Sequence, residues 1–201
     1  MKADVRLPKA AHEAHPWAIA QIAADFKLLD VWRLPAQGGL DDFDRLLEIM
    51  ASLDPANQGS RATRALFSVR YRVGGWFGWD DATRRRPVPG RVETTLSARL
   101  PEDLRGTAMR PDFSSTSFTP LYRTGDEWAA ELSNDTVHAV MHLAWIDEGG
   151  GLYHGQMGVY VKPRGRLGAT YMTLIGPFRH LIVYPALMRQ IQRAWEARTA
   201  S

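Results

Sequence analysis

Two alternating apolar runs joined by a glycine-rich turn place the tightest constraint on the fold of this chain. Residues 136–146 read TVHAVMHLAWI, residues 152–162 read LYHGQMGVYVK, and the link between them is DEGGG. Alternation of this kind is typical of β-strands, and a short glycine-rich link between two such runs closes an antiparallel hairpin. We therefore predict an antiparallel sheet that contains this hairpin.

Polar and apolar side chains separate onto opposite faces of the predicted hairpin. We expect Ile146 to pair with Leu152 across the turn, and this register sets which side chains share a face. One face then carries a polar column, which consists of His138, His142, His154, Gln156 and Tyr160. Either the column lines a pocket, where histidines could carry protons or bind a metal, or it is the solvent face of a one-sided sheet. No carboxylate lies between the histidines of the two arms to complete a ligand set, so we predict no metal site.

The other face of the hairpin is apolar. Its side chains could form ordinary core, or they could line an apolar cavity beneath a C-terminal helix, a role that suits methionine and aromatic residues. Together with two aromatic residues of the C-terminal segment, the candidate ligand-binding residues are Met141, Trp145, Tyr153, Met157, Tyr171 and Phe178.

The rest of the chain mixes extended and helical patterns. Residues 28–34 read LLDVWRL and predict a strand that Pro35 ends, whereas apolar residues at helical spacing predict a helix over 43–54. A second helix is predicted over 60–76 and a further strand over 94–100. Two further segments are predicted: a helix or a strand over 17–26, and a strand over 127–132. Helices and antiparallel strands in one chain indicate an α+β fold.

The C-terminal segment, residues 166–197, predicts a long helix that its glycines and prolines should bend or break. Because the segment is apolar on nearly every side, we expect it to be buried. Arg179, His180 and Tyr184 interrupt the apolar run, and His180 and Tyr184 lie one helical turn apart on one face. These three are the candidate catalytic residues, since an acid–base pair in an apolar pocket could polarise a ligand carbonyl or move a proton. Alternatively, they satisfy backbone or carboxylate partners within the fold.

Composition excludes several functions. The chain has no cysteine, which rules out thiolate catalysis, cysteine-ligated zinc and iron–sulfur clusters and fits a reducing compartment. The net charge is only +3, and the basic run at 84–86 lacks interleaved aromatic residues, so we predict no nucleic-acid partner. No phosphate-binding loop, dinucleotide fingerprint or nucleophile elbow occurs, so we predict no cofactor.

The length of 201 residues suits a single domain, with 1–27 as an N-terminal extension or first elements and 28–201 as the core. We find no targeting segment and no apolar run long enough to span a membrane, and therefore expect a cytoplasmic protein. The oligomeric state stays open between monomer and homodimer.

Several short motifs, spread along the chain, resemble those of a known family. They are HPW at 15–17, DVW at 30–32, FTPLY at 118–122, DEWA at 126–129, NDTVH at 134–138, VKP at 161–163 and, most specific, PFRHLIVYPALMRQI at 177–191. Together these motifs resemble the family called domain of unknown function 2867 (DUF2867). The resemblance spans nearly the whole chain except 81–91.

The resemblance implies the Bet v 1-like or START-like (SRPBCC) helix-grip fold. In that fold a curved antiparallel sheet wraps around a long C-terminal helix, two shorter helices close one end, and a cavity lies between. Members of the superfamily bind lipids, hormones and polyketides, and some cyclise or dehydrate their ligands. The family supplies no catalytic residues to carry over, and fold alone does not fix function.

Three functions therefore stand as hypotheses. The first is binding of a small apolar or amphipathic molecule in a cavity. The second is a cavity enzyme without a cofactor, a cyclase, dehydratase or isomerase acting on a polyketide-like or other apolar substrate, which would use either the three residues at 179–184 or the histidines of the polar column. The third is a protein-interaction module with exposed Trp76 and Trp79.

Overall fold

The structure is a computed structural model, and it describes residues 5–53, 95–107, 118–133, 137–165, 176–177 and 179–199. Several predictions made from the sequence fall outside these ranges: the helix over 60–76, the first part of the C-terminal helix over 166–175, the aromatic residues Tyr171 and Phe178, and the tryptophans Trp76 and Trp79.

An antiparallel sheet forms the centre of the described fold. Its order is β1-β2-β6-β5-β4-β3, and every neighbouring pair is antiparallel. The strands are β1 (Val5–Arg6), β2 (Lys27–Gly38), β3 (Thr119–Arg123), β4 (Glu127–Ser133), β5 (Val137–Asp147) and β6 (Tyr153–Pro163). The predicted hairpin is confirmed as β5–β6, and the predicted strand over 127–132 is confirmed as β4.

The register of the hairpin differs from the prediction by two residues. Ile146 pairs with His154 rather than with Leu152, and Asp147 pairs with Tyr153. β5 ends one residue later than predicted, at Asp147, and β6 begins one residue later, at Tyr153, so the link moves along the chain without shortening. The three glycines at 149–151 within it all adopt positive φ. A shift of two equals the period of a strand, so the predicted polar and apolar faces are preserved.

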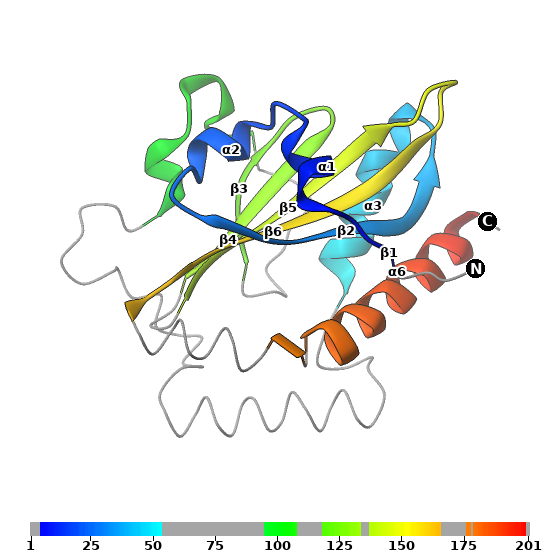
Figure 1. Cartoon of the computed structure of the whole chain (residues 1–201). Coiled ribbons are helices and arrows are strands. Elements are labelled where there is room, and N and C mark those ends of the chain that lie inside the picture. Colours follow the sequence, from blue (N-terminus) through cyan, green and yellow to red (C-terminus); the bar gives the residue numbers. More distant parts are fainter. Residues whose placement is uncertain are drawn as a thin grey trace.

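Helices cover both faces of the sheet (Figure 1). On one side lie α1 (Lys9–Glu13) and α2 (Ala18–Ile22), and on the other lies α6 (Tyr184–Thr199), which packs with α3 (Phe43–Ser52). The predicted helix over 43–54 is confirmed as α3, preceded by the 3-10 turn η1 (Leu40–Asp42). The segment 17–26, open between helix and strand, forms α2.

Each face therefore has its own apolar core. The core beneath α6 joins that helix and α3 to the sheet through side chains such as Leu34, Leu143 and Met157. The core beneath α2 joins Ile19 and Ile22 to the opposite face. The 3-10 turns η2 (Leu96–Arg99) and η3 (Glu102–Leu104) complete the second core with Leu96, Leu100 and Leu104.

Two predictions about strands are wrong. Pro35 does not end β2, which continues to Gly38, because the register with β6 shifts between Arg33 and Gln37 and no ladder hydrogen bond is required of the proline there. In the segment predicted as a strand over 94–100, Leu96–Arg99 form the 3-10 turn η2 instead. The Thr95 hydroxyl accepts a hydrogen bond from the Ser97 amide, and this cap favours the turn over extended backbone.

The predicted C-terminal helix is also more one-sided than its composition suggested. Tyr184, Met188, Ile191 and Trp195 point into the core at spacings of three and four residues, whereas Leu181 is 76 % exposed. The expectation of burial on every side is therefore wrong for the described part of this helix. Among the described residues no helix is both long enough and apolar enough to cross a membrane.

Candidate functional site

The three candidate catalytic residues converge on one carboxylate, Asp30 of β2. The Arg179 guanidinium lies 3.2 Å from Oδ2, the Tyr184 hydroxyl donates to Oδ2 at 3.4 Å, and His180 Nε2 faces Oδ1 at 3.5 Å. Asp30 is only 1 % exposed, so this is a buried polar site between the sheet and the C-terminal helix. The sequence prediction that His180 and Tyr184 share a face is confirmed by their ring separation of 5.7 Å.

A fifth residue, Arg6, reaches the same carboxylate from the N-terminal strand. Strand β1 pairs Arg6 with Trp32, which places the guanidinium on the face of β2 that carries Asp30, and Arg6 lies 2.9 Å from Oδ1. The Arg6 side chain remains 53 % exposed. We refer to Arg6, Asp30, Arg179, His180 and Tyr184 as the Asp30 cluster.

A β-bulge explains why Asp30 faces the C-terminal helix. Leu28 pairs with Tyr160 and Asp30 with Val159, so one extra residue is inserted in β2 between them. The bulge reverses the alternation: Leu28 and Val31 both lie in the core beneath α2, while Asp30 points to the opposite face. Sequence reasoning missed Asp30 and Arg6 because simple alternation would have placed Asp30 on the same face as Leu28.

The helical side of the cluster is an irregular turn. Residues Arg179–Val183 form η4, a π-helical turn directly before α6, and such turns are frequent at functional sites. Trp32 supports this turn from the sheet, with ring centroids 5.9 Å from His180 and 4.6 Å from Tyr184. Burial raises the pKa of the Tyr184 hydroxyl well above its usual value, so the group remains a hydrogen-bond donor to Asp30.

Two buried nitrogen atoms of the cluster have no hydrogen-bond partner within the described part of the chain. They are Nε of Arg179 and Nδ1 of His180. Buried polar groups are nearly always hydrogen-bonded, and each exception calls for an explanation such as a bound ligand or water. Both atoms belong to consecutive residues of η4, which makes this turn the place where a ligand group could be accepted.

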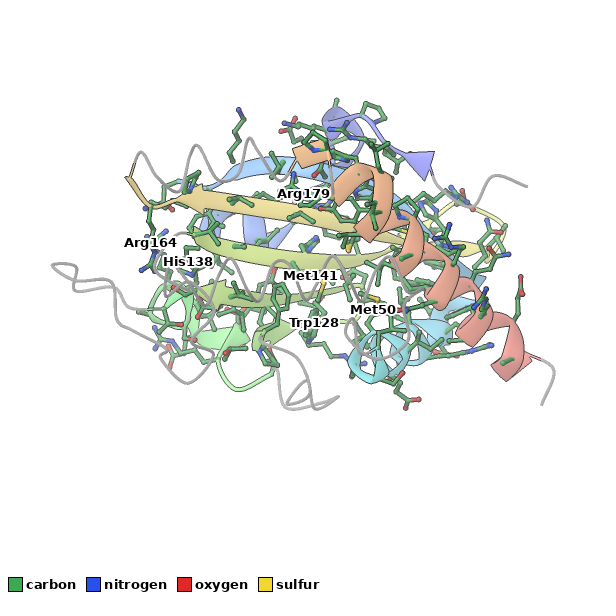
Figure 2. All side chains as sticks on the ribbon, turned by 90° about the horizontal axis from the view of Figure 1, so that it is seen from below. Met50, Trp128, His138, Met141, Arg164 and Arg179 are labelled. Carbon is green, nitrogen blue, oxygen red and sulfur yellow. The ribbon has the colours of Figure 1, made fainter. Side chains whose placement is uncertain are left out.

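An apolar row leads away from the cluster across the sheet. Asp30 pairs with Val159 of β6, and Val159 pairs with Met141 of β5, so the three side chains point to the same face in one line. Val159 and Met141 are only half-buried, although they lie on central strands. In Figure 2, Arg179 lies at the start of the C-terminal helix and Met141 nearer the middle of the sheet.

The other candidate ligand-binding residues have different positions. Trp145 and Met157 are fully packed core residues, and Tyr153 is half-buried with its ring stacked on that of Trp145. Of the predicted ligand-site residues that the structure describes, only Met141 adjoins the Asp30 cluster through the row. The core interpretation therefore holds for Trp145 and Met157.

The polar column lies on the opposite face, and it is buried rather than solvated. Its members His138, His142, His154, Gln156 and Tyr160 are all less than one-tenth exposed. The interpretation as a solvent face is therefore wrong, because the helices and 3-10 turns of the α2 side cover it. Sequence alternation separates two faces but does not reveal that a second layer of helices covers the polar one.

Glutamates of β4 partner two of these histidines. His142 Nε2 donates to Glu127 at 2.8 Å, and His138 Nε2 lies 2.7 Å from Glu131. Glu127 also accepts hydrogen bonds from the Tyr122 hydroxyl and the Ala18 amide. Burial lowers the pKa of His142. Burial by itself raises the pKa of Glu127, but the hydrogen bonds from His142, Ala18 and Tyr122 together with the charge of His142 exceed that effect and lower it. The pair is therefore a neutral imidazole donating to a carboxylate.

The N-terminal helix α1 adds a further histidine to the column. His12 is fully buried, its Nδ1 donates to the Gln156 side-chain oxygen at 2.5 Å, and its ring lies 5.0 Å from that of His142. No group of three His, Cys, Asp or Glu side chains that could hold a metal ion is found in the ranges that the structure describes. These contacts attach the first helices to the sheet, and the column is buried beneath them.

Comparison with known proteins identifies the family. The model of the family "Protein of unknown function (DUF2867)" matches residues 22–186, and the chain belongs to this family. The matched range includes Asp30, Val159 and the three cluster residues of the C-terminal segment, whereas Arg6 and His12 precede it. No curated protein and no solved structure matches the chain.

Proposed function

We propose that this member of the DUF2867 family binds a small amphipathic molecule between the sheet and the C-terminal helix. The polar end of the molecule contacts the Asp30 cluster, and its apolar part lies along Val159 and Met141. One observation carries the proposal: a buried polar cluster adjoins a row of central-strand apolar side chains that are incompletely covered. A few convergent polar groups beside an apolar surface are the usual composition of a small-molecule site.

The energetics of the cluster support a binding role over a purely structural one. A buried ion pair contributes little net stability, because the loss of hydration offsets much of the attraction. Each buried polar atom without a partner costs about 1–3 kcal/mol. A ligand that bonds to Arg179 Nε and His180 Nδ1 removes this cost, so the cluster is more stable occupied than empty.

The helix-grip assignment is part of the same proposal. An antiparallel sheet with a C-terminal helix across one face supports it, as does the placement of the Asp30 cluster between the two. The second layer formed by α1, α2 and the 3-10 turns on the outer face is an addition to that architecture.

The proposal is tested by native mass spectrometry on freshly purified protein, followed by denaturing extraction of any bound molecule. We expect a discrete extra mass that is released on denaturation and is lost in the variant Met141→Asp. The matched control is Tyr153→Asp, which changes a half-buried side chain on the same face at the other end of the sheet. Equal retention of the extra mass by both variants would place the ligand elsewhere and refute the site.

A second function is favoured by the position of His180. Its Nε2 faces a carboxylate while its Nδ1 has no partner within the described residues, which is the arrangement of a general base held in place by an acid. The protein would then be an enzyme without a cofactor acting on the bound molecule. The variant His180→Ala separates the two functions: an enzyme loses turnover of the extracted compound but keeps its binding, whereas a binding protein shows no turnover in either form.

A further inference from the structure

The Asp30 cluster has an excess of positive charge. Arg6 and Arg179 are permanently charged guanidiniums, and both are paired with the single carboxylate of Asp30. Neither arginine is paired with another carboxylate in the described ranges. Counted over the residues that the structure describes, the two guanidiniums and one carboxylate leave one positive charge of the cluster uncompensated.

The hydrogen-bond donor without an acceptor belongs to Arg179, one of the two arginines that carry this charge. Arg179 uses a terminal guanidinium nitrogen to contact Asp30, and its buried Nε has no acceptor within the described residues. A guanidinium binds a carboxylate best through two parallel N–H groups, so an acceptor at Nε is suited to an oxyanion. Arg6 contacts the other oxygen of Asp30 and is 53 % exposed, so its charge also favours an anion over a cation at the cluster.

A cationic head group is disfavoured at this site. Asp30 is the one carboxylate of the cluster, and it is already shared by two guanidiniums, a histidine and a tyrosine hydroxyl. An ammonium group would have to displace at least one arginine and would then face the other at short range. Like charges at such distances cost several kcal/mol in a poorly hydrated site.

We propose that the ligand of the Asp30 cluster is a carboxylate attached to an apolar chain. The carboxylate binds Arg179 Nε–H, and the chain lies over Val159 and Met141. This inference rests on the proposed function, since it assumes that the cluster and the row form one binding site, and it specifies the head group that the proposed function leaves open.

The test compares head groups on one apolar chain. Isothermal titration calorimetry on the full-length protein, stripped of bound molecules, measures the Kd of dodecanoate, methyl dodecanoate, dodecanol and dodecyltrimethylammonium, all below their micelle concentrations. A hydrogen bond to a charged group contributes about 1.5–3 kcal/mol, so dodecanoate should bind at least about tenfold more tightly than the ester or the alcohol. The ammonium probe should bind most weakly.

Two variants assign the preference to the cluster. Arg179→Gln should reduce dodecanoate affinity by about tenfold or more while changing dodecanol affinity by less than about twofold. The matched control is Arg33→Gln, which removes a guanidinium that is paired with Glu148. That control should bind every probe as the wild type does.

The outcomes separate the two proposals. If the ester, the alcohol or the ammonium probe binds as tightly as dodecanoate to the wild type, the carboxylate inference is refuted and the proposed site stands. If none of the four probes binds, both proposals fail for ligands of this length and shape. If dodecanoate is preferred equally by the wild type and by a folded Arg179→Gln variant, the carboxylate does not bind at this cluster. The wild-type comparison remains decisive even if Arg179→Gln does not fold.

Discussion

Acid should lower the stability of this protein through His12, whose side chain is fully buried. Its ring lies between α1 and the sheet, its Nδ1–H donates to Gln156, and its Nε2 has no partner within the described residues. Burial, and after it the nearby His142, lower the pKa of His12 from 6.5 to about 4. His15 acts in the same direction as His142, while Gln156 and Glu127 oppose them.

The direction of this pH effect follows from which state, folded or unfolded, binds the proton more readily. The unfolded chain binds a proton at His12 below pH 6.5, whereas the folded chain binds it only near pH 4. The contribution of neutral His12 to the free energy of unfolding is therefore complete above pH 6.5 and is lost as the pH falls toward 4. Each pKa unit corresponds to about 1.4 kcal/mol, so the free energy of unfolding falls by about 3 kcal/mol in total, of which about 2 kcal/mol is lost by about pH 5.

Urea unfolding measures this effect in a matched set of proteins. The wild type, His12→Gln and His15→Gln are each unfolded at about pH 7.5 and at about pH 5. The glutamine at 12 can still reach Gln156 but does not titrate, so this variant should lose about 2 kcal/mol less on acidification than the wild type. His15→Gln, in the same segment, should follow the wild type closely.

The comparison cancels the other titrating groups. His142, His154 and Glu127 are present in all three proteins, so their own titration is common to the set. His15→Gln additionally removes the small lowering effect of His15 on the pKa values of His12 and His154, for which it is a lesser cause than burial. An equal loss of stability in the wild type and in His12→Gln would refute the reasoning, because it would mean that His12 has no shifted pKa in the folded state.

Three further predictions concern stability and are checked by urea unfolding at neutral pH. Gly158→Ala should cost about 1–3 kcal/mol, because an added Cβ would lie 2.9 Å from the His12 ring, whereas Gly125→Ala, with no atom within 4 Å, should change stability by less than about 0.5 kcal/mol. Asp30→Asn should cost about 3–5 kcal/mol, because it leaves two guanidiniums beside a neutral group, and no loss would show that the cluster is open to water. Leu143→Ala, at 0 % exposure, should cost about 2–5 kcal/mol, and Leu181→Ala, at 76 %, less than about 0.5 kcal/mol; similar values for both would contradict the assigned faces.

The sequence predicted correctly those helices and strands that depend mainly on residues close together in the chain. The alternation on either side of DEGGG predicted β5 and β6, and apolar spacing predicted α3. The hairpin register was wrong by two residues, yet the faces were right, because an even shift preserves alternation. The strand over 94–100 was wrong because a hydroxyl cap at Thr95 outweighed the apolar alternation that followed it.

The candidate site was predictable only in part. His180 and Tyr184 were found because both belong to one helical segment, where spacing along the chain determines proximity. Their shared partner Asp30 could not be found this way, since a bulge in β2 reversed its face, and Arg6 reaches it only through the pairing of β1 with β2. Interactions between residues distant in the sequence depend on which strands pair, and alternation within one strand carries no information about that.

The sequence by itself determined that this is an α+β protein with an antiparallel hairpin, one polar and one apolar sheet face, and a histidine–tyrosine pair at the start of its last helix. Tertiary structure alone decided that the polar face is buried and that the apolar face carries a charged cluster. The physical reason is that periodicity records which side chains point together, whereas burial and charge pairing depend on what a distant part of the chain packs against. Here the first helices cover the polar column, and two arginines from opposite ends of the chain meet at Asp30.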